Sequence, residues 1–181
     1  MILTKWRFFA LLMATVLMTV GCSQEDDNEE TTQRTSIVNY LQGQQYPYTE
    51  VSGVYRYVIN ADRADYASSP VLESSGTAII DFAVYSFSTG LGQLYYTNRK
   101  DLVDKEYLPD LEQYWPFAPQ EVSLGDSRLI KGVRLGLAGC HEGDSVQLFL
   151  VSSLGYGDKP WGVVPANTPL VWDIVVKQVV K

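Results

Sequence analysis

Several stretches of this chain alternate between apolar and polar residues with the two-residue period of a β-strand. The clearest are Thr77–Phe87, Asp144–Val151 and the stretch from Leu170 onward, and a glycine-containing turn leads from the first into a further strand around Gln93–Thr97. Val54–Ile59 is rich in β-branched and aromatic residues and predicts one more strand. The pattern is that of a sheet-rich domain.

The segment between residues 129 and 139 has a different period. Ile130, Val133 and Leu137 are spaced to fall on one face of a short helix, and glycines follow it as stop signals. Gly132 and Gly136 lie inside this helix, where each costs about 1 kcal/mol relative to alanine, so we expect another part of the chain to approach the backbone there. Together the patterns predict an α+β domain in which an antiparallel β-sheet curls around one short α-helix.

The N-terminus has the organisation of a secretion signal. Lys5 and Arg7 precede an apolar run that ends at Val20, and Gly21-Cys22 forms a small-residue junction. Thr19-Val20-Gly21-Cys22 resembles a bacterial lipobox, with threonine where leucine is more usual. The resemblance implies that residues 1–21 are a lipoprotein signal peptide and that Cys22 becomes the acylated N-terminus. The alternative is a membrane anchor that stays uncleaved.

Residues 22–34 have the composition of a tether. Five carboxylates and no apolar side chain occur between Ser23 and Gln33, which favours disorder. The acidic run resembles a signal for export to the outer face of the outer membrane in some lipoproteins, and a plain solvated spacer is the alternative. A short helix over Ser36–Leu41 is expected to open an N-terminal extension (35–76) of a domain that spans residues 35–181.

Composition and motif content argue against several kinds of function. The net charge is −7, whereas nucleic-acid binding needs a basic surface. The single histidine, His141, and two cysteines make no zinc cluster, and no Gly-x-Ser-x-Gly elbow occurs. Cys140 is most simply a small buried thiol. We therefore expect neither a metal nor a cofactor.

Five short motifs follow one another in the second half of the chain. They are Leu124-Gly125, Ile130-Lys131-Gly132, Gly143-Asp144, Tyr156-Gly157 and the segment from Val164 to Asp173. In this order they resemble the FKBP-type peptidyl-prolyl isomerases, closely over the last third of the chain and loosely over residues 77–123. The motifs are specific as a set and not singly.

The resemblance implies a pocket that grips a proline ring and eases rotation about the X-Pro amide. The barrier to that rotation is about 18–20 kcal/mol, and a dry apolar site that favours the twisted amide lowers it without a nucleophile or a metal. The implied catalytic positions are Tyr156, Ile130 and Trp172, with the Tyr156 hydroxyl and the Ile130 amide as donors to substrate carbonyls. The implied substrate-binding positions are Phe82, Tyr96, Thr97, Leu129, Val133 and Val164. The plain alternative is that these side chains form only a core.

Three positions depart from the family pattern. The floor tryptophan of the family falls at Val133, its pocket aspartate at Thr97, and its flap histidine near Pro160. Trp172, where phenylalanine is usual, offers a larger ring that compensates for the valine, whereas the carboxylate has no evident substitute. A one-residue shift that places Tyr95 and Tyr96 at the aromatic-aspartate pair also leaves no carboxylate.

Two functions are compatible with these features. The first is a lipid-anchored isomerase of weak activity that assists the folding of envelope or surface proteins at their proline-containing segments. The second is a catalytically inactive relative that binds peptides or another surface component through the same groove. In both cases we expect a monomer held in the cell envelope through the lipid on Cys22 alone, at the outer membrane on its periplasmic face or at the cell surface.

Overall fold

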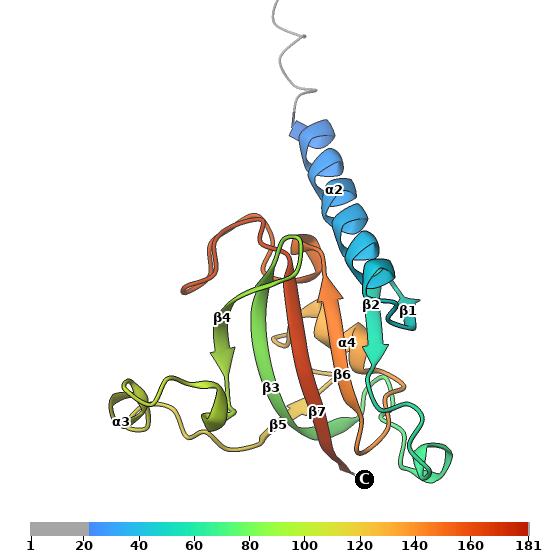
Figure 1. The fold of residues 1–181 in the computed structure, drawn as a ribbon, viewed down its shortest axis with the longest axis vertical. Helices are drawn as coiled ribbons and strands as arrows, with labels where there is room; N and C mark the ends of the chain where they lie inside the picture. The colour runs from blue at the N-terminus through green and yellow to red at the C-terminus, as the bar shows by residue number, and fades with distance from the viewer. Residues whose placement is uncertain (1–21, 181) are drawn as a thin grey trace, which may run out of the picture. The chain divides into compact units, whose positions relative to one another are not determined.

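The computed structural model describes residues 22–180, and the signal peptide expected over residues 1–21 lies outside this range (Figure 1). The chain divides into two compact units between Thr32 and Gln33. In the described part of the first unit the backbone is helical, as the beginning of α2 (Cys22–Gly43), and the Thr32 hydroxyl donates to the Asn28 carbonyl at 2.9 Å.

The second unit is an antiparallel sheet of seven strands among the described residues. The strand order is β1-β2-β6-β7-β3-β4, and β5 pairs with β3 beside this path (Figure 1). The bounds are β1 Tyr48–Val51, β2 Val54–Val58, β3 Thr77–Phe87, β4 Leu91–Thr97, β5 Gln120–Ser123, β6 Ser145–Leu150 and β7 Leu170–Val180, with α3 Leu108–Leu111 and α4 Lys131–Leu137 as helices. The predicted antiparallel α+β architecture is confirmed.

The central strands β3 and β7 follow the predicted alternation. Along β7 the side chains of Leu170, Trp172, Ile174 and Val176 are buried, and Lys177 is exposed. The pairing register brings Trp172 opposite Leu148 of β6 and Val84 of β3, and Val84 opposite Tyr96 of β4. Directly paired residues share a face of the sheet, so Tyr96 and Trp172 lie on the same face, two strands apart.

Helix α4 packs closely against that face of the sheet. A Cβ atom added at Gly132 would lie 2.6 Å from a Leu150 methyl carbon, and one at Gly136 would lie 2.8 Å from a Leu148 methyl carbon. Real Cβ atoms essentially never come so close, and at Gly132 the Leu154 carbonyl oxygen would also lie only 2.7 Å away, so a side chain at either position would force the packing to shift. The sequence-based inference that a neighbouring part of the chain crowds the two helix glycines is correct.

Helix α2 corrects the expectation for the N-terminal region. Residues 22–34, expected to be a disordered tether, are helical, and the expected short helix over Ser36–Leu41 is the last part of the same element. Ile37 and Leu41 are one turn apart and fully buried, and the Tyr40 ring lies 5.5 Å from Phe87 and 5.8 Å from Phe149. The packing of these apolar side chains stabilises the helix, whereas the polar composition of its first half gives no sign that a helix forms.

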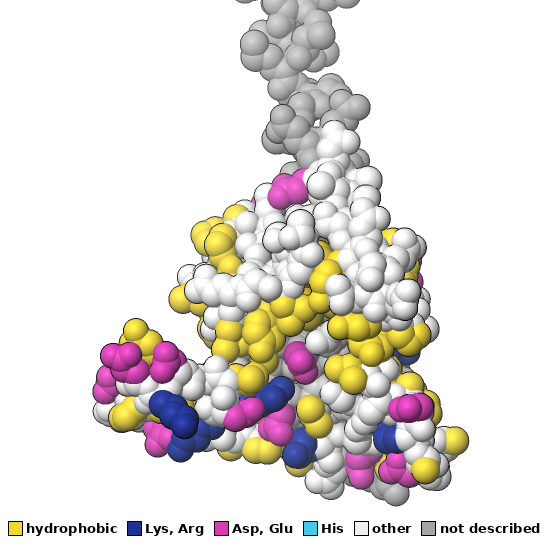
Figure 2. All heavy atoms as spheres, in the orientation of Figure 1, with side chains coloured by type: hydrophobic (Ala, Val, Ile, Leu, Met, Phe, Trp, Pro, Cys, Tyr) yellow, Lys and Arg dark blue, Asp and Glu magenta, His cyan; other side chains and the backbone are white. Residues whose placement is uncertain are grey.

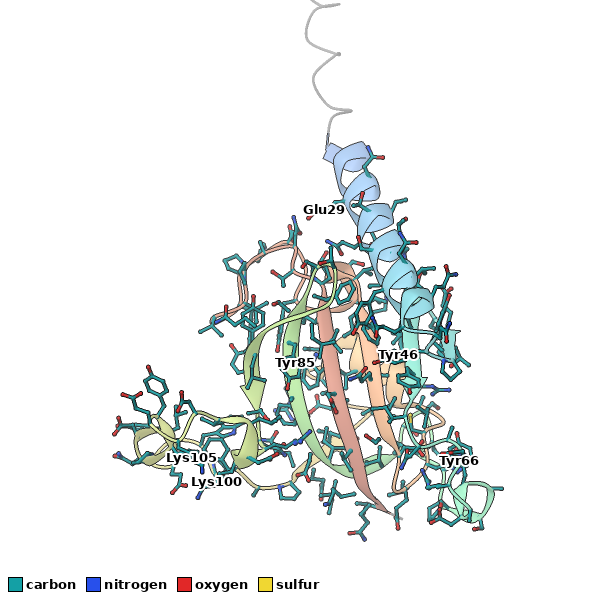
Figure 3. The ribbon with its side chains drawn as sticks, in the orientation of Figure 1. Glu29, Tyr46, Tyr66, Tyr85, Lys100 and Lys105 are labelled. Atoms are coloured by element: carbon teal, nitrogen blue, oxygen red, sulfur yellow. The ribbon has the colours of Figure 1, made fainter. Side chains whose placement is uncertain are left out.

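Two further parts of the chain add to this fold. The extension over residues 35–76 contains β1 and β2; the strand expected over Val54–Ile59 is β2, and it pairs with β6. The segment between β4 and β5 contains the short helix α3 (Figure 3, where Lys100 and Lys105 mark the segment). Its exposed apolar side chains are Tyr107, Leu111 and Tyr114.

Candidate functional site

The turn before α4 places Leu129 and Ile130 at the edge of a cavity. The Asp126 carboxylate accepts hydrogen bonds from the Arg128 guanidinium at 2.7 to 3.1 Å and from the Arg128 backbone amide at 2.9 Å. These bonds, chiefly those from the guanidinium, lower the pKa of Asp126 to about 2. The Ile130 carbonyl accepts from the Arg134 amide at the start of α4, and its own amide donates to no described residue. The Ile130 amide, without an acceptor among the described residues, therefore belongs to a residue that lines the cavity.

The loop from Val151 to Pro169 carries the second part of the site. It begins with a 3-10 turn over Ser152–Leu154, and Trp161 and Val164 exchange two backbone hydrogen bonds further along. The Trp161 ring stacks on Tyr156, with ring centroids 4.8 Å apart and planes only 7° from parallel, and Tyr96 contacts Trp161 edge to face at 6.0 Å. Three aromatic rings from β4 and this loop therefore form one continuous wall.

Burial strongly shifts the acidity of Tyr156. Desolvation, with a smaller contribution from Tyr96, raises the pKa of the Tyr156 hydroxyl from 10.0 to about 12. No described residue accepts a hydrogen bond from this hydroxyl. At neutral pH it is thus a protonated donor available to a carbonyl oxygen.

Trp172 forms the floor of the site at the middle of the sheet. Its ring stacks on Phe82 with centroids 5.4 Å apart, and only 7% of the residue is exposed. The indole N–H is buried without a hydrogen-bond partner among the described residues. The floor is therefore apolar in effect, with one donor left unpaired.

These elements enclose a cavity of about 470 Å³. Its lining residues are Ser127, Arg128, Leu129, Ile130, Lys131, Arg134, Gly155, Tyr156, Trp161 and Trp172. All three expected catalytic positions, Tyr156, Ile130 and Trp172, lie on its wall, together with one expected substrate-binding position, Leu129. A volume of about 470 Å³ accommodates a proline ring and its flanking amides.

The other expected substrate-binding positions lie elsewhere. Val133 is fully buried beneath the cavity, and Val164 and Phe82 are buried at 1% and 6% exposure without lining it. Tyr96 and Thr97 line a neighbouring apolar cavity of about 410 Å³. Its remaining walls are Leu94, Tyr95, Leu102, Val103, Asp104, Leu111, Trp115, Phe117 and Val163, most of them from the segment between β4 and β5.

Thr97, where the resemblance places the family carboxylate, has a structural role here. Its hydroxyl donates to the Phe82 carbonyl at 2.7 Å and accepts from the Arg99 amide at 2.9 Å. Its own carbonyl accepts from the Trp115 indole at 2.7 Å. The next residue, Asn98, is 3% exposed and bonds with its side chain to the backbone of Ile80, Phe82 and Ala118. The Thr97 hydroxyl thus uses its only proton on the Phe82 carbonyl and has no donor left for a ligand.

The sequence did not identify Trp161 or the positive charge of the cavity rim. Trp161 follows Pro160 in the loop, and an aromatic residue five positions after Tyr156 was the available signal. Arg128, Lys131 and Arg134 line the cavity, and no described acidic side chain is among its lining residues. Asp126, whose pKa Arg128 and to a smaller extent Arg134 lower, lies beside them, and the Arg134 Nε is buried without a partner among the described residues. The rim therefore favours a negatively charged group near the proline site.

Two further observations concern the surface of the molecule and the residues that could bind a metal ion or cross a membrane. On the face drawn in Figure 2, hydrophobic side chains gather over the upper half of the sheet, while charged side chains of both signs lie around α3. Within residues 22–180, no three His, Cys, Asp or Glu side chains are grouped so that they could hold a metal ion, and no helix is long and apolar enough to cross a membrane. Cys22 begins α2, and its side chain lies outside the described ones.

Comparison with known proteins agrees with this geometry. The family model for FKBP-type peptidyl-prolyl cis-trans isomerases matches residues 112–177, from the segment before β5 into β7. The chain is 36% identical over 62 residues to FK506-binding protein 4 of Chaetomium thermophilum and 34% identical over 56 residues to FK506-binding protein 1 of Aspergillus oryzae. These stretches are 34% and 31% of this chain, and they span only 13% and 48% of the two relatives.

Solved structures extend the likeness to the whole fold. A peptidyl-prolyl cis-trans isomerase from Pseudomonas syringae pv. tomato superposes with a TM-score of 0.60 at 16% identity, over 86% of this chain and 96% of that one. FkpA from Escherichia coli gives a TM-score of 0.55 at 16% identity, over 98% of this chain and 70% of that one. At 16% identity the superpositions establish the fold and not the activity. The chain thus has the fold of the FKBP-type peptidyl-prolyl cis-trans isomerases and matches the model of that family over residues 112–177.

Proposed function

We propose that this protein is a prolyl cis-trans isomerase of low turnover that acts on proline-containing segments of envelope or surface proteins. The observation that carries the proposal is the cavity over Trp172, where the Ile130 amide and the Tyr156 hydroxyl have no acceptor among the described residues and lie beside an apolar floor. A proline ring on Trp172 would place its flanking carbonyls within reach of these donors. Rotation about an amide bond needs no nucleophile, so an apolar floor with two hydrogen-bond donors has the kinds of group that the reaction requires.

Low turnover is proposed because of Thr97. The Thr97 hydroxyl stands where the resemblance places the family carboxylate. It donates its only proton to the Phe82 carbonyl and accepts a hydrogen bond from the Arg99 amide, so it is not available to orient or polarise a twisted amide. Loss of one preorganised electrostatic contact in a dry site costs on the order of 10²–10³ in rate. Binding of the proline ring depends mainly on apolar contact and is expected to be affected less.

The charge of the rim supports a preference among peptides. Arg128 is already paired with Asp126, whereas Arg134 and Lys131 make no ion pair with a described acidic residue. An acidic side chain close to the proline would complement these two cations, and it would do so most strongly at low ionic strength. We therefore propose acidic proline segments as the preferred substrates.

The cellular placement rests on the sequence of the N-terminus. We propose that Cys22 carries the lipid, that the protein is a monomer, and that this anchor holds it at the outer membrane. Several acyl chains anchor a protein stably, whereas one gives marginal binding. A Cys22→Ala variant is expected in the soluble fraction after cell lysis. Recovery of that variant with the membranes would refute a lipid anchor.

The activity is tested by isomerisation of a short X-Pro peptide with wild type and Tyr156→Phe. The variant keeps the ring that stacks on Trp161 and removes only the hydroxyl donor. We expect measurable acceleration by wild type, a reduction of about tenfold or more in the variant, and similar peptide affinity in both. Peptide binding without any acceleration by wild type would instead support a catalytically inactive, peptide-binding member of the family.

A further inference from the structure

Gln33, the first residue of the larger unit, makes an unusual connection to the loop that carries Tyr156. Its side chain is 7% exposed, although it belongs to a helix expected to be a polar tether. The side-chain oxygen Oε1 accepts a hydrogen bond from the Ser152 amide at 2.8 Å, and the side-chain nitrogen Nε2 donates to the Asn167 carbonyl at 3.1 Å. One carboxamide thus joins the beginning of this loop to its end.

Two backbone hydrogen bonds complete a closed ring. The Gly157 amide donates to the Ser152 carbonyl at 2.9 Å, and the Asn167 amide donates to the Gly157 carbonyl at 2.9 Å. The ring therefore passes through Gln33, Ser152, Gly157 and Asn167 and returns to Gln33. Gly157 directly follows Tyr156 and has φ +78°, and Asn167 has φ +54°. Such conformations persist when surrounding contacts fix them, and the ring supplies those contacts.

The helix that presents Gln33 is itself firmly held. Ile37 and Leu41, one and two turns further along α2, are completely buried, and Tyr40 packs against Phe87 and Phe149. Gln33 is therefore a fixed point against which the loop is aligned. Without the Gln33 carboxamide, the Ser152 amide and the Asn167 carbonyl would both lose this partner at the base of the loop.

We propose that Gln33 is a positioning residue for Tyr156, acting through Ser152, Gly157 and Asn167. The inference rests on the proposed function for its catalytic consequence and on the hydrogen-bond ring for its structural one. It assigns to the N-terminal helix a role in shaping the proline site. A purely structural contribution of Gln33 would instead lower the stability of the whole domain and would affect loop and sheet alike.

The experiment uses the full chain in detergent with three variants. Gln33→Met keeps the length of the side chain and removes both hydrogen bonds, and Gln33→Glu keeps the acceptor for Ser152 but loses the donor to Asn167. Gln42→Met is the matched control, since Gln42 is an exposed glutamine of the same helix. Hydrogen exchange of the Ser152, Gly157 and Asn167 amides is compared with that of β6 and β7 amides. The kcat and KM for an X-Pro peptide are measured in parallel.

In Gln33→Met we expect the three loop amides to exchange at least about tenfold faster than in wild type while the strand amides keep their rates. We expect kcat to fall by about tenfold to a hundredfold with little change in KM, an intermediate result in Gln33→Glu, and no change in Gln42→Met. Unchanged loop exchange, or equal acceleration in loop and strands, would overturn the inference. If wild type shows no isomerisation, the proposed function fails, and the exchange measurement still decides the role of Gln33.

Discussion

Replacing Trp172 by phenylalanine separates the apolar role of this residue from the cost of its unpaired indole N–H. Phenylalanine keeps an aromatic ring against Phe82, whose centroid lies 5.4 Å from that of Trp172, and it removes the buried N–H that has no partner among the described residues. Alanine at the same position removes the ring and the N–H together. The two substitutions therefore differ mainly in whether the floor of the cavity survives.

The magnitudes follow from these contacts. A buried donor without a partner costs about 1–3 kcal/mol, so its removal by Trp172→Phe offsets the loss of part of the indole's apolar surface, at about 0.8 kcal/mol for each buried CH₂ equivalent. The free energy of unfolding is therefore expected to change by no more than about 1 kcal/mol. Trp172→Ala opens a cavity in the centre of the sheet and is expected to cost about 3–5 kcal/mol.

Urea unfolding followed by far-UV circular dichroism measures both variants against wild type, with the slope of the transition as a check that the unfolded state is unchanged. Titration with an X-Pro peptide is expected to show retained binding in Trp172→Phe and loss of binding in Trp172→Ala. Equal destabilisation by the two substitutions would show that the indole N–H is well paired and would refute the reasoning. Unchanged peptide affinity in Trp172→Ala would show that no proline binds at this position.

Further substitutions and titrations test the remaining parts of the account. Thr97→Val is expected to lower the free energy of unfolding by about 1–3 kcal/mol, because the Arg99 amide loses its acceptor and the Phe82 carbonyl loses a donor. Thr97→Asp is expected to destabilise as well, since its carboxylate would face the Phe82 carbonyl oxygen, and a faster and equally stable Thr97→Asp enzyme would contradict this. The pKa of Tyr156 is raised from 10.0 to about 12, so the unfolded chain loses this proton at a lower pH than the folded chain. The contribution of Tyr156 to the free energy of unfolding is therefore full below pH 10.0 and is lost as the pH rises towards 12, and urea unfolding across that range measures it. Burial likewise raises the pKa of the Cys140 thiol from 9.0 to about 11, so a thiol reagent at pH 8 is expected to modify it only after unfolding, and fast modification of native Cys140 would contradict its burial. A peptide with glutamate beside proline is expected to bind more tightly than its lysine counterpart, and Arg134→Met is expected to reduce that difference, as isothermal titration at two salt concentrations would show.

The fold was predictable where periodicity and glycine placement carry the information. Strand β3 has the predicted bounds, β7 begins where predicted, and the crowding at Gly132 and Gly136 follows from glycine inside a helix. Helix α2 was not predictable, because the composition of residues 22–34 predicts disorder and the stabilising contacts come from distant strands. Strand β5 has four residues, too few to show a period.

The expected catalytic positions lie in motifs that occur in a recognisable order along the chain. Ile130, Tyr156 and Trp172 line one cavity, and their roles there stay a prediction. Thr97 was recognised as a departure, but its engagement with Phe82 and Arg99 depends on hydrogen-bond geometry that the sequence does not encode locally. The link from Gln33 to Ser152 joins residues 119 positions apart, and no local pattern marks such a contact.

The central claim is that the cavity over Trp172 binds a proline segment and turns it over slowly. It is tested most directly by exchange spectroscopy on an acidic X-Pro peptide, which reports binding and cis-trans interconversion in one sample with catalytic amounts of the full chain. We predict clear binding and an interconversion rate above the uncatalysed one, lower by about 10²–10³ than that of a family member with the complete pocket motif. An interconversion rate equal to that of such a member, or the absence of both binding and acceleration, would contradict the account.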